Sequence, residues 1–252
     1  MIKRADKNGV KRIVCIGTDP TDSLAAQKFA EKHKNVYWTY GIHPENAELK
    51  SQRGGFRSAA ARDLAPSARG DGPDGRDPEW DSNSASPVAI GEIGLDYHSD
   101  GYNRKAQIKL FEEMLQLAKD NDLPVSFHVR NAFDDFFPVV ANFPEVRGVV
   151  HSFTDSKKVL KRILETTDYY VGVNGLATYS TLPTPPLNRI LLETDAPFLT
   201  PVPFRGIINE PAYILNIAQW LSEKLDLDFE TVEKETTLNA GRLYRFQDTE
   251  SA

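Results

Sequence analysis

Short apolar segments rich in β-branched residues alternate along this chain with segments whose apolar residues recur at helical spacing. This alternation is typical of a parallel β-sheet whose strands are joined by helices. The expected strands cover residues 11–18, 36–44, 89–98, 124–130, 148–153, 169–175 and 188–195. The expected helices cover residues 1–10, 21–33, 107–121, 132–141, 156–166, 211–225 and 229–242. Asn8 and Gly9 are expected to cap the end of the first helix. The expected apolar faces are those of Leu24, Ala25, Phe29 and Ala30 in the second helix and of Leu110, Met114, Leu117 and Ala118 in the third. The order predicts an α/β fold whose strands close into a TIM-type β/α barrel.

An open, doubly wound parallel sheet is the alternative architecture for the same alternation. The best-known ligands of that fold are dinucleotides, which bind a glycine-rich G-x-G-x-x-G turn after the first strand. No such sequence follows any expected strand. The dinucleotide-binding version of the open sheet therefore has no support.

Composition sets broad limits on location and partners. The chain has 252 residues with a formal net charge of -6, so it lacks the global positive field of a nucleic-acid-binding protein. Any phosphate would have to be met by a few local cations or by bound metal ions. The single cysteine, Cys15, excludes an intramolecular disulfide. No apolar run approaches the roughly 18 residues of a membrane span and no signal peptide opens the chain, which predicts a cytoplasmic protein.

Residues 50–86 interrupt the alternation. Arginine and aspartate are scattered there among Gly, Ala, Ser and Pro, with few aromatic or β-branched residues. Such a segment buries too little apolar area to offset the entropy lost on ordering. We therefore predict one barrel domain over residues 1–252, with a disordered insertion at 50–86.

Four expected strands pass from apolar residues to one ionisable side chain of the kind that binds metals. These residues are Glu92, His128, His151 and Asp195. In a parallel barrel all C-terminal strand ends lie on one face, so residues distant in sequence meet there. Two imidazoles and two carboxylates would suit Zn, Mn or Mg. A single histidine at a strand end is more often a hydrogen-bonded structural residue, but four successive exits favour a metal-dependent hydrolase.

Several motifs along the chain resemble the TatD family of metal-dependent deoxyribonucleases. The resemblance covers nearly the whole chain outside residues 50–86. The matching segments are Gly41–Pro44, Gly91–Tyr97, Phe127–Arg130, Val149–Phe153, Leu191–Leu199, Pro201–Gly206, Asn209–Pro211 and Thr236–Ala240. The resemblance implies a TIM-type barrel that carries two divalent ions and hydrolyses DNA phosphodiesters, with 3′ ends or single strands as the expected substrate.

By position in these motifs, Glu92 resembles the ligand that bridges both ions. His128 and His151 resemble ligands of one ion. Asp195 resembles a ligand of the other ion and the proton acceptor for the attacking water, so Glu92 and Asp195 are the expected catalytic residues.

The chain departs from the family pattern at its start. The family's first strand carries a His-x-His pair, and residues 1–12 contain no histidine. If Met1 is the true start, we expect a barrel without its first strand. One ion would then keep only Glu92 and Asp195, whereas the other would keep Glu92, His128 and His151 and remain a plausible site. A single ion and a weakened or inactive enzyme are the expectations in that case.

Cationic and aromatic residues beside the expected ligands are the candidates for contacts with the substrate. Arg130 and Arg205 are candidates for phosphate contacts, with structural salt bridges as the alternative. Tyr97 could stack on a base, or line the barrel rim. His43 could orient a ligand or the phosphate.

The same metal–water chemistry also serves hydrolases of small esters, lactones or amides, and the fold does not choose between these substrates. A DNA phosphodiesterase is the first hypothesis and such a small-molecule hydrolase the second. A third is a chain that has lost activity with its first two histidines.

Overall fold

The computed structural model describes residues 1–48 and 86–246, so nearly all of the predicted insertion lies outside the described residues. Contacts divide the chain into two compact units. We call Val14–Val146 the first unit, and Met1–Ile13 together with Arg147–Ala252 the second unit. Strand β1 (Ile13–Cys15) lies where the chain passes from one unit to the other.

Three parallel strands form the framework of the first unit. They are β2 (Val36–Tyr40), β3 (Ala89–Asp96) and β4 (Val125–Arg130), and β3 pairs with both neighbours. The register between β3 and β4 shifts between Ile90 and Ile93, as in a β-bulge. A bulge changes the direction of side chains locally, and Glu92 lies within this irregular stretch.

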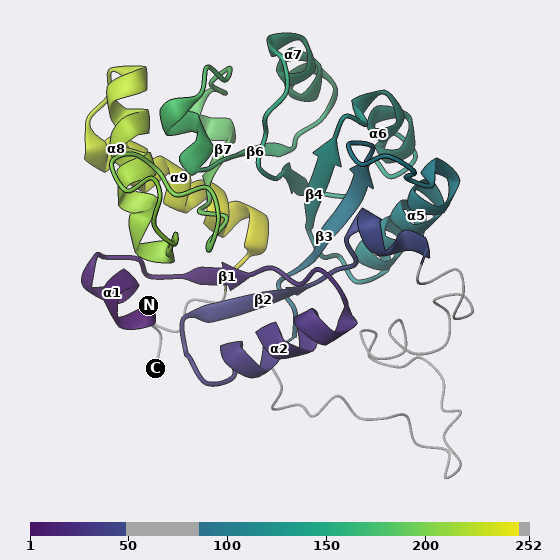
Figure 1. Ribbon diagram of the computed structural model, residues 1–252, viewed down its shortest axis with the longest axis horizontal. Helices are drawn as coiled ribbons and strands as arrows, with labels where there is room; N and C mark the ends of the chain where they lie inside the picture. The colour runs from purple at the N-terminus through teal and green to yellow at the C-terminus, as the bar shows by residue number, and fades with distance from the viewer. Residues whose placement is uncertain (49–85, 247–252) are drawn as a thin grey trace. The chain divides into compact units, whose positions relative to one another are not determined.

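Helices accompany the strands of the first unit (Figure 1). Helix α5 buries Leu110, Met114, Leu117 and Ala118, the four residues predicted to form its apolar face. Helix α6 contributes Phe136, whose ring stacks with Phe111 of α5 at 6.0 Å between centroids. The elements are α2 (Pro20–Ala30), the 3₁₀ turn η1 (Pro44–Asn46), α5 (Arg104–Asp120) and α6 (Phe133–Val140).

Helix α2 differs from its prediction. Of the four residues expected on its apolar face, Ala30 is buried and Phe29 half-buried, but Leu24 and Ala25 are exposed. Ser23 is buried instead. The Ser23 hydroxyl accepts a hydrogen bond from the Gly41 N–H at 3.3 Å. A buried hydroxyl with a backbone partner is tolerated, so this polar contact decides which face of α2 turns inward.

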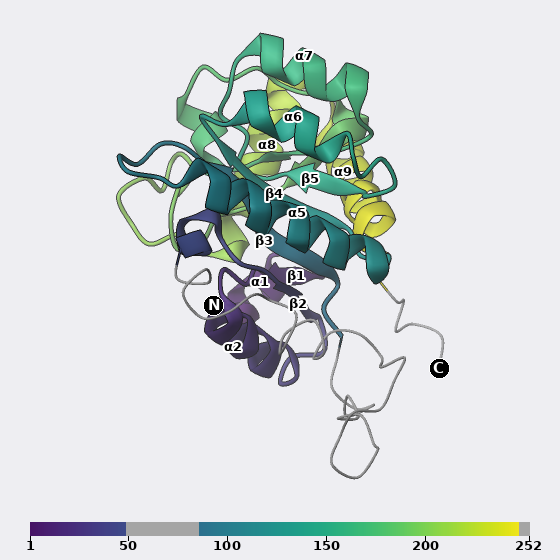
Figure 2. The same ribbon diagram turned by 90° about the vertical axis from the view of Figure 1, so that its right-hand side faces the viewer.

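The second unit is built in the same way around β5 (Gly148–Val150), β6 (Tyr170–Val173) and β7 (Ile190–Leu192), which pair in parallel. Its core joins Val173 and Ile190 of the strands to Ile217 and Leu221 of α8 and Val232 of α9. Helices α8 and α9 lie side by side (Figure 2). The other elements are α1 (Ile2–Lys7), α7 (Lys157–Thr166), η2 (Gly175–Tyr179), η3 (Leu187–Arg189), η4 (Pro211–Tyr213), α8 (Ile214–Leu225) and α9 (Phe229–Tyr244).

Most strands are shorter than expected, and this changes where the polar residues lie. His151 and Asp195 follow β5 and β7 on turns, whereas Glu92 and His128 lie inside β3 and β4. At the start of the chain, the predicted helix end is confirmed, because Asn8 caps α1 and Gly9 has a φ of +82°.

Among the described residues, no helix combines the length and the apolar character needed to cross a membrane.

Candidate metal centre

His128 lies between two carboxylates of the neighbouring strand in the first unit. Its Nδ1 is 2.6 Å from Oε1 of Glu92, and its Nε2 is 2.8 Å from Oδ2 of Asp96. Glu92 and Asp96 are four residues apart on β3, so the period of two in a strand places them on the same face. We call Glu92, Asp96, His128 and His43 the first set.

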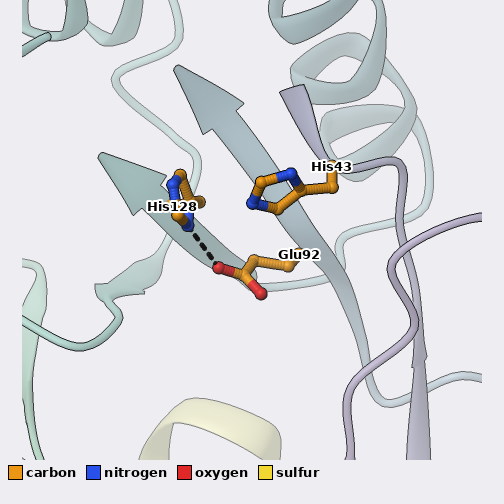
Figure 3. A group of neighbouring side chains, drawn as sticks. All are labelled: His43, Glu92 and His128. Atoms are coloured by element: carbon orange, nitrogen blue, oxygen red, sulfur yellow. Dashed lines mark hydrogen bonds and ion pairs between the residues drawn. The ribbon is translucent and has the colours of Figure 1, made fainter. Parts of the chain in front are cut away.

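His43 adds a second imidazole to the first set (Figure 3). It comes from the chain between β2 and η1, and its ring meets that of His128 edge-on at 4.3 Å between centroids. His43, Glu92 and His128 each offer a ligand atom, and these atoms all lie within 4.8 Å of one another. This spacing would allow all three to contact one cation.

Neighbouring carboxylates and burial set the pKa values of the two histidines in the first set. Burial lowers the pKa of His128, but hydrogen bonds with Asp96 and Glu92 outweigh it and raise this pKa to about 9. Burial lowers the pKa of His43, and the neighbouring His128 lowers it further. His128 is therefore protonated at neutral pH unless a cation takes the place of the proton.

Two contacts hold the carboxylates and His128 in position. Gly94 has a φ of +145°, and a Cβ at this position would lie 2.0 Å from the carbonyl oxygen of His128. Only glycine permits so close an approach between β3 and β4. Gln107 of α5 binds both backbone groups of Asp96, accepting from its N–H and donating to its carbonyl, each at 2.8 Å.

The second unit repeats the arrangement around His151. The Nδ1 atom of His151 is 2.8 Å from Oε2 of Glu193, and its Nε2 is 2.9 Å from Oδ1 of Asp195. We call these three residues the second set. Like the first, it places one imidazole between a glutamate and an aspartate.

Backbone and amide groups orient the second set. The Ser152 N–H donates to Oε1 of Glu193 at 2.5 Å, and the Asn174 amide donates to Oδ2 of Asp195 at 3.0 Å. Gly172 makes room for Glu193, because a Cβ there would lie 2.3 Å from Oε1 of Glu193. Burial raises the pKa of Glu193, and the neighbouring His151 opposes this rise.

The donor chemistry of the first set fits a divalent metal ion. Imidazole nitrogen suits zinc and other transition metals, and carboxylate oxygen suits manganese and magnesium. Asp96, bound to a ring nitrogen of His128, is placed like the carboxylates that orient metal-binding histidines in other sites. In the second set, Glu193 and Asp195 each hold one ring nitrogen of His151, and both carboxylates are half-buried.

The residues predicted to bind substrate lie in several different settings. Arg130 is exposed at the end of β4, and its charge contributes to lowering the pKa of Asp96. Arg205 is exposed, and its guanidinium carbon lies 3.9 Å above the Tyr179 ring. Tyr97 donates to Oδ2 of Asp135 at 2.8 Å. The contacts of Arg130, Arg205 and Tyr97 with substrate stay predictions. His43, which was predicted to orient a ligand or the phosphate, is a candidate metal ligand in the structure.

Asp96 and Glu193 are the residues that sequence reasoning missed. Each lies an even number of residues from a predicted ligand, Asp96 four after Glu92 and Glu193 two before Asp195. The period of two in a strand could have identified both.

The predicted four ligands are divided between the two units. Glu92 and His128 meet in the first set, and His151 and Asp195 meet in the second. Their convergence on a common cation stays a prediction.

Comparison with known proteins adds independent evidence. The family model described as TatD related DNase matches residues 1–245. A protein of Bacillus subtilis named uncharacterized metal-dependent hydrolase YabD is 32% identical over 257 aligned residues, which cover 97% of this chain and 91% of that protein. A protein of Erwinia billingiae named 3′-5′ ssDNA/RNA exonuclease TatD is 30% identical, and the match covers 97% of this chain and 92% of that one.

A solved structure supports the fold. The crystal structure of YJJV, a TatD homologue from Escherichia coli, matches with a TM-score of 0.79 and 27% identity, and covers 97% of this chain and 90% of that chain. The likeness confirms the predicted α/β fold class of TIM-type metal-dependent hydrolases.

Proposed function

Because the chain belongs to the TatD-related DNase family, we propose that this metal-dependent hydrolase is a deoxyribonuclease that cleaves phosphodiester bonds of single-stranded DNA. The observation that carries the proposal is the first set, in which His43, Glu92 and His128 offer ligand atoms within 4.8 Å of one another. The name of the Erwinia relative, which is that of an exonuclease for single-stranded DNA and RNA, supports the choice of substrate.

In this proposal His43, Glu92 and His128 hold a divalent ion, with Asp96 fixing the orientation of His128. Such an ion, when bound, lowers the pKa of a water molecule and neutralises charge that develops on phosphate oxygens. Because the chain has a formal net charge of -6, the ion would also supply positive charge that a phosphate needs.

The second set supplies a proton acceptor. Asp195 has one oxygen 2.9 Å from Nε2 of His151 and the other within hydrogen-bond distance of the Asn174 amide. These contacts fix the carboxylate plane, so that Asp195 can accept the proton of the attacking water without first reorienting. Glu193 holds the opposite nitrogen of His151 and thereby fixes the ring.

Exposed arginines are the expected phosphate contacts. Arg130 serves this purpose in the first unit and Arg205 in the second, because a guanidinium matches phosphate oxygens with two parallel hydrogen bonds. Release of nucleotides from 3′ ends is the expected mode, since this is the polarity in the name of the Erwinia relative.

The proposal is tested with full-length protein stripped of metal by a chelator. Mg²⁺, Mn²⁺ or Zn²⁺ is added back, and nucleotide release is followed from labelled single-stranded DNA, duplex DNA and RNA, beside a panel of lactones. We expect metal-dependent release from single strands. We also expect Glu92→Gln, which keeps the side chain's shape but removes its charge, to lower kcat/KM by about 100-fold or more.

Glu165→Gln is the matched control, because it makes the same change at an exposed position of α7. Failure of the wild-type chain to cleave any phosphodiester with any of the three metals would contradict the proposal. Turnover of lactones without nuclease activity would assign the chain to the small-molecule hydrolases instead.

A further inference from the structure

The segment that follows Asp195, residues 196–208, has a backbone fixed by buried polar side chains. The Asn209 amide donates to the carbonyls of Thr194 and Phe198, each at 2.6 Å. The Thr200 hydroxyl donates to the Ile207 carbonyl at 2.6 Å. Asn209 and Thr200 are both buried. This segment is therefore a cross-linked loop whose shape is set before any ligand arrives.

The 196–208 segment presents apolar side chains to solvent. Phe198 is 72% exposed, Ile207 53% and Ile208 78%. Single exposed apolar residues are common, but several gathered on one short, fixed loop mark a binding surface. The backbone N–H of Phe198 donates to the carbonyl of Asp195 at 2.7 Å, so this surface begins beside the second set.

Arg205 adds a fixed positive charge to the same loop. Its guanidinium carbon lies over Tyr179, 3.9 Å from the ring centroid, which is a cation–π contact. Within residues 1–48 and 86–246 the structure shows no carboxylate or carbonyl acceptor for this guanidinium. Stacking on an aromatic ring orients an arginine but leaves its N–H groups available for another partner.

Tyr179 and the 196–208 segment are both tied to the second set. Asn174, the residue before η2, contacts Asp195, and Tyr179 is the last residue of η2. The N–H of Val202 donates to the Thr178 hydroxyl at 3.0 Å. The cation and the apolar side chains thus belong to one framework that also carries the proposed proton acceptor.

We infer that the 196–208 segment is a docking surface for single-stranded nucleic acid, in which Arg205 binds a backbone phosphate and Phe198 stacks on an unpaired base. The inference rests on the proposed function and assigns its substrate class to particular residues. Single strands carry groups that complement this surface: a phosphate at every nucleotide for Arg205, and the flat face of an unpaired base for Phe198. An anionic membrane is disfavoured, because the surface carries a single arginine and the chain is acidic overall.

Binding is measured by fluorescence anisotropy of a labelled oligothymidylate on the full chain, with a chelator present so that no hydrolysis occurs. Loss of one stacked base weakens binding by about tenfold. We expect that increase in Kd for Phe198→Ala, a smaller one for Phe198→Leu, and a comparable loss for Arg205→Gln. Arg205→Lys should recover only part of the affinity, because lysine keeps the charge but not the planar fork.

Leu238→Ala is the control for removal of an exposed apolar side chain, since Leu238 lies on α9 and is 42% exposed. Its Kd should match that of the wild type. Circular dichroism of each variant establishes that it is folded.

Steady-state cleavage separates this inference from the proposed function. The inference predicts that Phe198→Ala loses more kcat/KM on the oligonucleotide than on an abasic strand of the same length, which has the phosphates but no base to stack. If the wild type cleaves both substrates but the Phe198 and Arg205 variants bind the oligonucleotide like the wild type, the docking surface is wrong while the nuclease stands. If the wild type cleaves no phosphodiester, both proposals fail together. Two other outcomes would reassign the surface, provided that Phe198→Ala leaves the oligonucleotide Kd unchanged. If Phe198→Ala abolishes self-association, the surface binds a second copy of the chain. If it abolishes binding to vesicles, the surface binds lipid.

Discussion

His128 in the first set and His151 in the second each lie between a glutamate and an aspartate, yet the two units support these groups differently. Around His128, both carboxylates lie on the same face of β3, four residues apart, and glycine at position 94 lets the strands approach. Around His151, the carboxylates follow β7 on a turn where Asp195 has a φ of +56°. Glu92, Asp96 and His128 of the first set thus lie on strands, whereas all three residues of the second set lie after β5 and β7.

This difference suggests a division of labour. A site on paired strands keeps its donor atoms at fixed separations, which suits ion binding. On turns, the positions of the donor atoms depend on individual hydrogen bonds. In the second set these bonds come from the Asn174 amide, the Glu193 carboxylate and the backbone N–H of Ser152. Non-glycine residues with positive φ cost free energy and are concentrated at functional sites. Ser152, Asp195 and Leu199 all have φ near +50° and flank the second set.

The largest expected effect breaks the first set. His128→Asn removes an imidazole that contacts both Glu92 and Asp96, and leaves two carboxylates without their shared partner. We expect the affinity for Mn²⁺ or Zn²⁺ to fall by more than the 10–100-fold that is typical of outer-shell substitutions. Isothermal titration of the metal-stripped protein measures the change.

His98→Asn is the control for that experiment, because His98 is exposed and lies outside the group of three candidate ligands. Equal losses for both variants would remove His128 from the site. In the wild type, metal affinity should rise between pH 7 and pH 9. The reason is that the pKa of His128 is raised to about 9, so that a cation must displace a proton below that pH.

The next effect tests the strand support of the first set. Gly94→Ala places a methyl group against the His128 carbonyl at a φ that other residues rarely adopt. We expect the free energy of unfolding to fall by about 3 kcal/mol. Urea denaturation followed by circular dichroism gives the value.

Gly101→Ala separates the two causes. Gly101 also has a positive φ, +81°, but nothing lies within 4 Å of a Cβ there. Its loss should be about 1 kcal/mol and reflect backbone strain alone. If the two alanines cost the same, the close approach of β3 to β4 does not matter for stability.

The smallest expected effect concerns the second set. Glu193→Gln keeps one hydrogen bond to His151 or to the Ser152 N–H but removes the negative charge that holds the ring. We expect about a tenfold loss of metal-supported kcat/KM, near the lower end for an orienting partner. Steady-state kinetics at saturating metal measure it, and Glu223→Gln on α8 is the exposed control. A loss as large as that of Glu92→Gln would make Glu193 a direct participant.

Much of the fold could be predicted, because strands and helices differ in the period of their apolar residues. The apolar face of α5 followed that rule. Helix α2 followed it only in part, since Ser23 is buried through a hydrogen bond to Gly41 that no periodicity encodes.

The site was predicted in part for a related reason. Glu92 and His128 are polar residues in otherwise apolar strands, which identifies them in the sequence, and their side chains are in contact in the structure. The role of His43 depends on the path of the chain between β2 and η1, which spacing alone does not determine. Asp96 and Glu193 were missed because each lies close in sequence to a carboxylate that was already assigned as a ligand.

The pair of hydrogen bonds between Gln107 and the backbone of Asp96 ties a helix to the chemistry of a strand. Loss of this amide would leave the N–H and the carbonyl of Asp96 without their hydrogen-bond partner. Asp96 is the residue whose carboxylate contacts His128. Selection acting on turnover would then also act on α5, at a residue that never touches substrate. A mutational survey that ranks residues by distance from the reacting atoms would therefore underrate it.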